Sequence, residues 1–233
     1  MNTSNDFNLK NDSYIYDITK FTHLDYPDHL AAIIWFSGCN MRCDYCYNKE
    51  IVLAKKGSIT MQETLEFLSS RVSLLDGVVL SGGEATAYDL VEFCQIIKRM
   101  GFEIKLDTNG TYVKNFQTLL DRQLIDYVAL DYKAPEEKFK TITHSNRYDE
   151  FSQSLNLLLK SKVDFEVRTT LHPDLLTPSD INIIINDLYQ RGYNKPYYIQ
   201  EFLNTQNNLA GLKKASSLFE KSQLDNKLTI VWR

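Results

Sequence analysis

The chain has 233 residues, of which 43% are hydrophobic and 24% charged, and its 26 basic and 30 acidic side chains give a net charge of −4. This length allows one large domain or two small ones, and the composition is that of an ordinary globular protein. The acidic balance argues against a general nucleic-acid binder, which needs a basic face to displace counterions from phosphates.

The first 13 residues are polar and lack hydrophobic periodicity, so we expect residues 1–13 to form a flexible N-terminal tail. They do not resemble a secretion signal, and the chain contains no apolar stretch long enough to suggest a membrane span. These features predict a cytoplasmic protein in which residues 14–233 form a single domain.

Short runs rich in β-branched and aromatic residues recur along the chain and predict strands. They cover residues 31–36, 76–81, 103–108, 126–132, 164–170 and 196–202, and further runs at 14–20 and 228–232 are expected to flank the sheet. Apolar residues at three- and four-residue spacing between these runs predict amphipathic helices. The residues are Leu65, Leu68 and Val72, then Leu90, Phe93, Ile96 and Ile97, then Ile181, Ile184, Ile185 and Leu188.

Start and stop signals agree with these helices. Thr60 precedes Glu63 at the spacing of a capping box, and Thr177 stands before a proline suited to a first helical turn. Gly101 and Gly192 follow two of the helices at the usual stop position.

The alternation of strands and helices implies parallel strands joined by right-handed crossovers. Either an open doubly wound sheet or a complete or partial (β/α) barrel fits this pattern. Six units within about 170 residues, without a dinucleotide-binding glycine fingerprint, favour a single-domain α/β fold built as a partial (β/α)6 barrel. In either architecture, functional side chains gather at the C-terminal ends of the strands.

The cysteines are distributed unevenly. Cys39, Cys43 and Cys46 lie within eight residues after the strand at 31–36, whereas Cys94 stands alone on an apolar helix face and is expected to be inert. Thiols this close together cannot join distant segments as disulfides, and they typically bind metal in a reducing compartment. Three thiolates on one loop can ligate three irons of a [4Fe-4S] cluster and leave the fourth iron open to a small molecule.

Two alternatives for the cysteine loop stay open. A structural zinc site would usually have a fourth ligand at finger-like spacing, which this sequence lacks. A group of inert buried thiols is the other alternative.

Polar residues follow the later strands. Gly82 and Gly83 permit a tight turn, and the carboxylate of Glu84 can accept hydrogen bonds from an ammonium group. Alone, a Gly-Gly-Glu sequence is an ordinary turn between a strand and a helix.

The next two strands end in charged and amide residues. Asp107 and Asn109 close the strand at 103–108, and Asp131 and Lys133 close the strand at 126–132. Asp131 and Lys133 share a face by strand alternation, where they can bind hydroxyl and carboxylate groups of a ligand. A simple salt bridge explains this pair equally well.

The cysteine spacing, with an aromatic residue before the third cysteine, resembles the radical S-adenosylmethionine (SAM) superfamily of oxidoreductases. The resemblance implies a [4Fe-4S] cluster on Cys39, Cys43 and Cys46, whose open iron is chelated by the amino and carboxylate groups of SAM. One electron then cleaves SAM to methionine and a 5′-deoxyadenosyl radical. Implied SAM contacts are Gly82, Gly83 and Glu84 at the amino group. Tyr45 can pack on the adenine, although an aromatic side chain buried beside the cluster would serve packing equally well. Further candidate contacts with SAM or substrate are Asp107, Asn109, Asp131, Lys133, Arg168 and His172. A lone histidine before a proline, as at His172, is more often structural.

Most of the chain, from about residue 14 to residue 233, resembles the activating proteins of anaerobic ribonucleoside-triphosphate reductase. The matching stretches, besides the cysteine loop, are Phe21–Pro27, Leu75–Glu84, Lys105–Gly110, Asp131–Pro135 and Arg168–Pro173. The resemblance implies a protein substrate, the reductase, in which the radical removes hydrogen from a glycine Cα and leaves a glycyl radical. It also implies flavodoxin or ferredoxin as the reductant.

Other functions remain as alternatives. An activating enzyme of another glycyl radical enzyme, such as pyruvate formate-lyase, shares the chemistry but not the partner. The similarly short 7-carboxy-7-deazaguanine synthases typically have Thr or Ser where this chain has Asn48. A metal-stabilised binding protein without SAM chemistry is the non-enzymatic alternative, which the intact cysteines and Glu84 disfavour.

Overall fold

The computed structural model describes residues 13–204 and 207–233. Almost all of the predicted N-terminal tail lies outside the described residues. Within them, no helix combines the length and apolar character needed to cross a membrane. The elements are β1 (Ile15–Thr22), β2 (Ala31–Phe36), α1 (Lys49–Leu53), α2 (Met61–Ser69), β3 (Gly77–Gly82), η1 (Ala85–Ala87), α3 (Val91–Arg99), β4 (Glu103–Thr108), α4 (Val113–Asp121), β5 (Tyr127–Asp131), α5 (Glu136–Thr143), α6 (Tyr148–Lys160), β6 (Asp164–Leu171), α7 (Pro178–Gln190), β7 (Tyr197–Glu201), η2 (Lys221–Gln223) and β8 (Ile230–Trp232).

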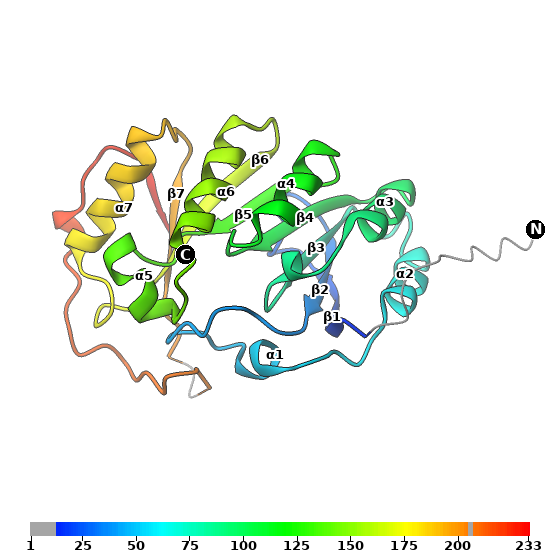
Figure 1. Cartoon of the computed structure of the whole chain (residues 1–233), viewed down its shortest axis with the longest axis horizontal. Coiled ribbons are helices and arrows are strands. Elements are labelled where there is room, and N and C mark those ends of the chain that lie inside the picture. Colours follow the sequence, from blue (N-terminus) through cyan, green and yellow to red (C-terminus); the bar gives the residue numbers. More distant parts are fainter. Residues whose placement is uncertain (1–12, 205–206) are drawn as a thin grey trace, which may run out of the picture.

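The described strands form one eight-stranded sheet in sequence order, from β1 to β8. β1 is antiparallel to β2, and every later neighbouring pair is parallel. β1 and β8 form the two edges, and the sheet curves into an open barrel with helices along its outside (Figure 1). This arrangement confirms the predicted single-domain α/β partial barrel.

The hydrophobic core lies between the sheet and the helices. Alternate residues of β2, such as Ile34 and Phe36, belong to this core. The residues between them face the other way, and Ile33 forms a small separate cluster with Val79 and Tyr26. Both faces of β2 and β3 are therefore covered, which explains why these two strands read as nearly continuous apolar runs.

The predicted helix signals are present. Thr60 and Thr177 each begin a helix with a complete capping box, formed with Glu63 and Asp180. Gly101 and Gly192 take the positive φ values of 93° and 84° that suit glycine after a helix.

Helix α2 is shorter than its apolar spacing predicts. Val72 was expected on this helix, but it lies in the turn beyond it and is 44% exposed. The hydroxyls of Ser69 and Ser70 donate to the carbonyl oxygens of Glu66 and Phe67 at 2.7 and 2.6 Å. Such side-chain bonds compete with helical hydrogen bonds and end the helix early.

Within the described residues, the sixth unit of the barrel lacks an α-helix after its strand. Among the described residues between β7 and β8, the only regular element is the short 3-10 helix η2. A cavity of about 280 Å³, lined in part by Leu171, Phe202, Phe219 and Trp232, remains on this side.

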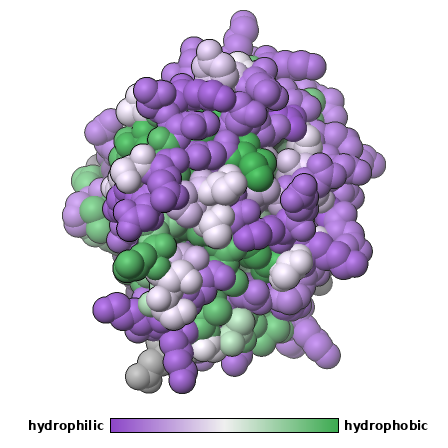
Figure 2. Space-filling view, turned by 90° about the vertical axis from the view of Figure 1, so that its left-hand side faces the viewer, coloured by the Kyte–Doolittle hydropathy of each residue, from purple (hydrophilic) through white to green (hydrophobic). Residues whose placement is uncertain are grey.

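The face on the α7 side carries separate hydrophobic patches on a mostly hydrophilic surface (Figure 2). We call residues 208–217 of the irregular connection the strap.

Candidate active site

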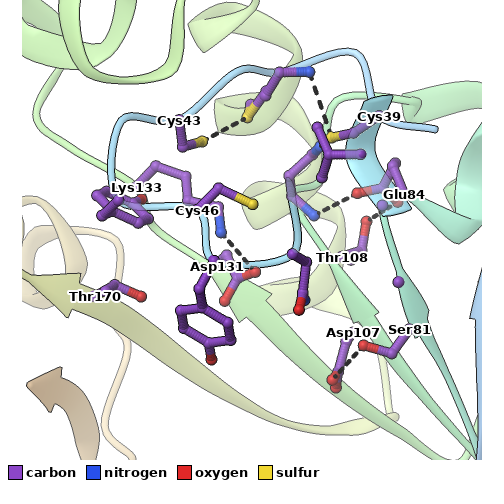
Figure 3. Close-up of a pocket in the computed structure, with 18 of the residues that line it drawn as sticks. Cys39, Cys43, Cys46, Ser81, Glu84, Asp107, Thr108, Asp131, Lys133 and Thr170 are labelled. Carbon is purple, nitrogen blue, oxygen red and sulfur yellow. Dashed lines mark hydrogen bonds and ion pairs between the residues drawn. The ribbon is translucent and has the colours of Figure 1, made fainter. Parts of the chain in front are cut away.

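A cavity of about 220 Å³ opens at the C-terminal ends of the barrel strands. It brings together nearly all of the residues that the sequence predicted as functional, although they come from separate strands and loops (Figure 3). These residues are Cys39, Cys43, Tyr45, Cys46, Gly82, Gly83, Glu84, Asp107, Asn109, Asp131, Lys133 and Arg168.

The cysteine loop follows β2 and presents its three sulfur atoms to this cavity (Figure 3). Burial raises the pKa of Cys39 to about 11 and that of Cys43 to about 12. Such thiols ionise readily only beside positive charge, which iron supplies. The sulfur of Cys39 accepts hydrogen bonds from the Met41 amide at 3.4 Å and the Asn109 side chain at 3.7 Å, as expected for a cluster ligand.

A single-ion site fits the structure less well. Among the described residues, no group of three His, Cys, Asp or Glu side chains is arranged to hold one metal ion. Ligands to three different irons need not converge on one point, so this arrangement disfavours zinc without bearing on a cluster.

The Gly-Gly-Glu turn packs against the start of the cysteine loop. The Gly83 amide donates to Phe36 O at 2.8 Å, and the Glu84 amide donates to Gly38 O at 2.9 Å. A Cβ atom on Gly83 would lie 1.8 Å from Gly38 O. Glycine is therefore required here by the contact between the two loops.

The Glu84 side chain joins this turn to the end of β4. It is 2% exposed and accepts hydrogen bonds from the Thr86 amide and hydroxyl, the Thr108 hydroxyl and the Asn109 amide. Three of these bonds reach Oε1, and one, at 2.8 Å, reaches Oε2. Burial raises the pKa of Glu84 although these donors oppose the shift. A cation beside Oε2 would further stabilise the charged form.

Charged side chains of β4, β6 and the end of β5, with Lys133 just beyond it, form a continuous chain beside the cavity. Asp107 lies 2.5 Å from the Nζ of Lys105 and 3.4 Å from the guanidinium of Arg168. Asp131 lies 2.6 Å from Arg168 Nε and 2.9 Å from Lys133 Nζ. The predicted pair of Asp131 and Lys133 is therefore part of a larger network.

This network contains more positive than negative charge. Lys105, Arg168 and Lys133 outnumber Asp107 and Asp131 by one, which leaves a net positive charge. Burial alone would raise the pKa of Asp131, but Arg168 and Lys133 lower it to about 2. A surplus cation beside a cavity suits a carboxylate or another anionic group of a ligand.

Tyr45 leaves a polar atom unsatisfied at the cavity. The residue is 4% exposed, and its ring centroid lies 5.8 Å from Lys133 Nζ. Its hydroxyl is buried and finds no hydrogen-bond partner within the part of the chain that the structure describes. Buried hydroxyls are normally satisfied, so this atom is an exception at a residue that lines the cavity.

His172 is the predicted site residue that does not line this cavity. It is 1% exposed, its Nδ1 accepts from the Asp174 amide at 3.2 Å, and its Nε2 lies 2.9 Å from Lys213 O. Nε2 therefore carries the proton and donates to the carbonyl. His172 fixes the strap, and this placement does not support the expected contact with SAM.

Some cavity residues were missed by sequence reasoning. Trp35, Thr170 and Gln200 line the cavity from β2, β6 and β7. The two-residue period of a strand places Thr170 on the same face as Arg168, and Gln200 pairs with Thr170 in the sheet. The strand period could have predicted Thr170 from the sequence. Gln200 could be placed only once the pairing of β6 with β7 was known.

Comparison with known proteins identifies the class. The Radical SAM superfamily model matches residues 33–188, so the chain belongs to this superfamily, as predicted. The chain is 34% identical over 202 residues to a candidate glycyl-radical enzyme activating enzyme of Methanocaldococcus jannaschii, covering 79% of this chain and 82% of the relative. Within the superfamily, the chain therefore belongs to the family of glycyl-radical enzyme activating enzymes.

Other similar proteins are more distant. The pyruvate formate-lyase-activating enzyme of Clostridium pasteurianum is 28% identical over 151 residues, covering 60% of this chain and 62% of that enzyme. The solved structure of anSMEcpe with bound AdoMet matches with a TM-score of 0.59 at 18% identity, covering 72% of this chain and 49% of that one. This chain thus spans about half the length of that protein, and the likeness shows the fold alone.

Proposed function

We propose that the cavity holds a [4Fe-4S] cluster on Cys39, Cys43 and Cys46 and binds SAM beside it. The observation that carries this proposal is the convergence of the three thiols and the Gly-Gly-Glu turn on one cavity. Oε2 of Glu84, which receives one hydrogen bond from the described residues, suits the amino group of SAM. The surplus cation of the network suits its carboxylate.

The chain's own residues bind and orient SAM in this proposal. When bound, the cluster supplies the electron that cleaves SAM to methionine and a 5′-deoxyadenosyl radical. Tyr45 is positioned at the cavity wall to pack on the adenine, and Asp107, Asn109 and Asp131 line the same space. The family of this enzyme and the AdoMet bound in its structural neighbour support this assignment.

We infer that the substrate is anaerobic ribonucleoside-triphosphate reductase, with flavodoxin or ferredoxin as the reductant. The radical takes a hydrogen atom from a glycine Cα of the reductase, which yields 5′-deoxyadenosine and a glycyl radical. The stretches of the chain that resemble the reductase-activating proteins support this target.

Pyruvate formate-lyase is the second candidate target. The similarity to the Clostridium pasteurianum activating enzyme favours it. Membership of the activating-enzyme family, by contrast, argues against a deazaguanine synthase and overturns the non-enzymatic alternative.

The test incubates the anaerobically reconstituted enzyme with SAM, a chemical reductant and either purified reductase or purified pyruvate formate-lyase. Electron paramagnetic resonance detects the glycyl radical, and chromatography measures 5′-deoxyadenosine. We expect a radical on the reductase. A radical on pyruvate formate-lyase alone would establish the second candidate, and cleavage of SAM with neither radical would exclude both targets.

Two cysteine variants control this experiment. Cys43→Ala should lose the cluster and all cleavage of SAM, because it removes a ligand. Cys94→Ala should keep both, since Cys94 lies fully buried on α3 away from the cavity. Cleavage of SAM by the Cys43 variant would contradict the proposed ligand set.

A further inference from the structure

The cysteine loop is also held from outside the cavity, by the C-terminal end of α5. We propose that His144 is a positioning residue that fixes the cysteine loop for cluster binding through its contact with Asp44. This inference rests on the proposed cluster site and names a residue outside the cavity.

The last turn of α5 accepts hydrogen bonds from the loop backbone. The Arg42 amide donates to Thr143 O at 2.9 Å, and the Asp44 amide donates to Ile142 O at 3.0 Å. Carbonyl groups at the end of a helix have no partner within the helix. Two of them are satisfied here by the segment that carries the cysteines, so α5 is the surface on which the loop is seated.

His144 follows this helix in an unusual backbone conformation. Its φ of 54° and ψ of 34° are left-handed, and the residue is the C-cap of α5. Glycine adopts this conformation without strain and is the usual residue in it at helix ends, whereas other L-residues do so at a cost. The backbone alone would therefore favour glycine at position 144.

The side chain of His144 explains the exception. Its Nε2 lies 2.7 Å from Oδ1 of Asp44. Asp44 stands between Cys43 and Cys46 in the sequence. An ionised carboxylate can only accept, so His144 donates from Nε2 whether its ring is neutral or charged. Histidine at this position adds a side-chain tether that glycine cannot supply.

Asp44 is also held by the strap. Its carbonyl oxygen accepts from the Ala210 amide of the strap at 3.1 Å, and Cys46 O accepts from the Leu209 amide at 3.0 Å. Asp44 is thus the point where α5, the strap and the cysteine loop meet. Loss of the His144 contact leaves these backbone bonds in place, so the loop should loosen without unfolding.

The chain provides a matched control in Gln123. This residue follows α4, has the same φ of 54°, and is exposed. It does not line the cavity. Gln123→Gly therefore relieves the same backbone strain as His144→Gly without touching the cysteine loop.

The experiment measures two quantities on anaerobically reconstituted proteins: the melting temperature and the rate at which iron passes to an excess of chelator. We expect both glycine variants to melt at or above the wild-type temperature. Only His144→Gly should release iron faster, by about two- to fivefold, as expected for loss of one partly exposed side-chain hydrogen bond. Asp44→Ala should have a similar effect, and combining it with His144→Gly should add little.

The outcomes separate this inference from the proposed function. Wild-type protein that takes up no cluster overturns both. A wild-type protein that holds the cluster, together with equal iron release from His144→Gly and Gln123→Gly, overturns only the role of His144. If His144→Gly does not fold, unchanged iron release from Asp44→Ala overturns that role.

Discussion

Glu84 is almost completely buried, and it is also one of the residues that line the cavity. Donors from Thr86 and Thr108 occupy Oε1, whereas Oε2 receives one amide. Replacement by alanine would leave buried donors without partners and would disturb the fold as well as the site. Glutamine keeps the size and one oxygen but removes the charge, so it tests ligand binding more cleanly.

We predict that Glu84→Gln lowers the affinity for SAM about tenfold or more while the cluster still forms. A hydrogen bond between charged groups typically contributes about 1.5 to 3 kcal/mol, and the neutral amide loses most of it. Equilibrium binding of SAM to the reconstituted protein measures the change. Glu63→Gln is the control, because it removes the same charge at the exposed capping box of α2. Unchanged SAM affinity in the Glu84 variant would exclude this role.

Among the elements, local signals predicted the strands and helix starts because hydrophobic period and capping act over a few residues. The same signals could not show that Gly83 faces Gly38, since that contact joins loops distant in the sequence. They also missed the contact of His172 with the strap, because the irregular strap has no hydrophobic period that would predict its position. The cysteine loop was predictable because its ligands lie together in the sequence.

The contact between the Gly-Gly-Glu turn and the cysteine loop gives a prediction about Gly83. Gly83→Ala should reduce the free energy of unfolding by at least about 3 kcal/mol, the upper range for overpacking, because its Cβ would meet a backbone oxygen. Gly101→Ala should cost only about 1 to 2 kcal/mol, since its φ is positive but its surroundings are open. Denaturant unfolding measures both. Equal losses of unfolding free energy in the two variants would show that the Gly-Gly-Glu turn and the cysteine loop separate easily.

At the scale of the whole molecule, the barrel is open and its interior is charged. β1 and β8 do not pair, and the strap crosses from the cysteine loop, through its hydrogen bonds to Asp44 and Cys46, to the loop after β6. Inside, the network of Asp107, Asp131 and their cations links three neighbouring strands. Ion pairs therefore contribute to the integrity of the same strands that carry the site.

Asp131 makes this contribution dependent on pH. Its folded-state pKa of about 2 lies below the ordinary value of 3.8, so the folded state favours the ionised form. The resulting stability is present above about pH 4 and is lost as the pH falls through about 2. Asp131→Asn should therefore lower the free energy of unfolding by about 2 kcal/mol or more at pH 7, and by progressively less toward pH 2.

Urea unfolding of iron-free wild type and variant between pH 7 and pH 2 measures this difference without a contribution from cluster loss. Asp225→Asn is the control, because the Asp225 side chain is only half-buried and lies 3.8 Å from its lysine partner. That change should alter the free energy of unfolding by less than about 0.5 kcal/mol. The free energies of unfolding of wild type and Asp131→Asn should converge in acid. A protonated aspartic acid, like asparagine, no longer compensates the charges of Arg168 and Lys133. A difference that stays constant across this range would mean that Asp131 stabilises the barrel by packing rather than by charge.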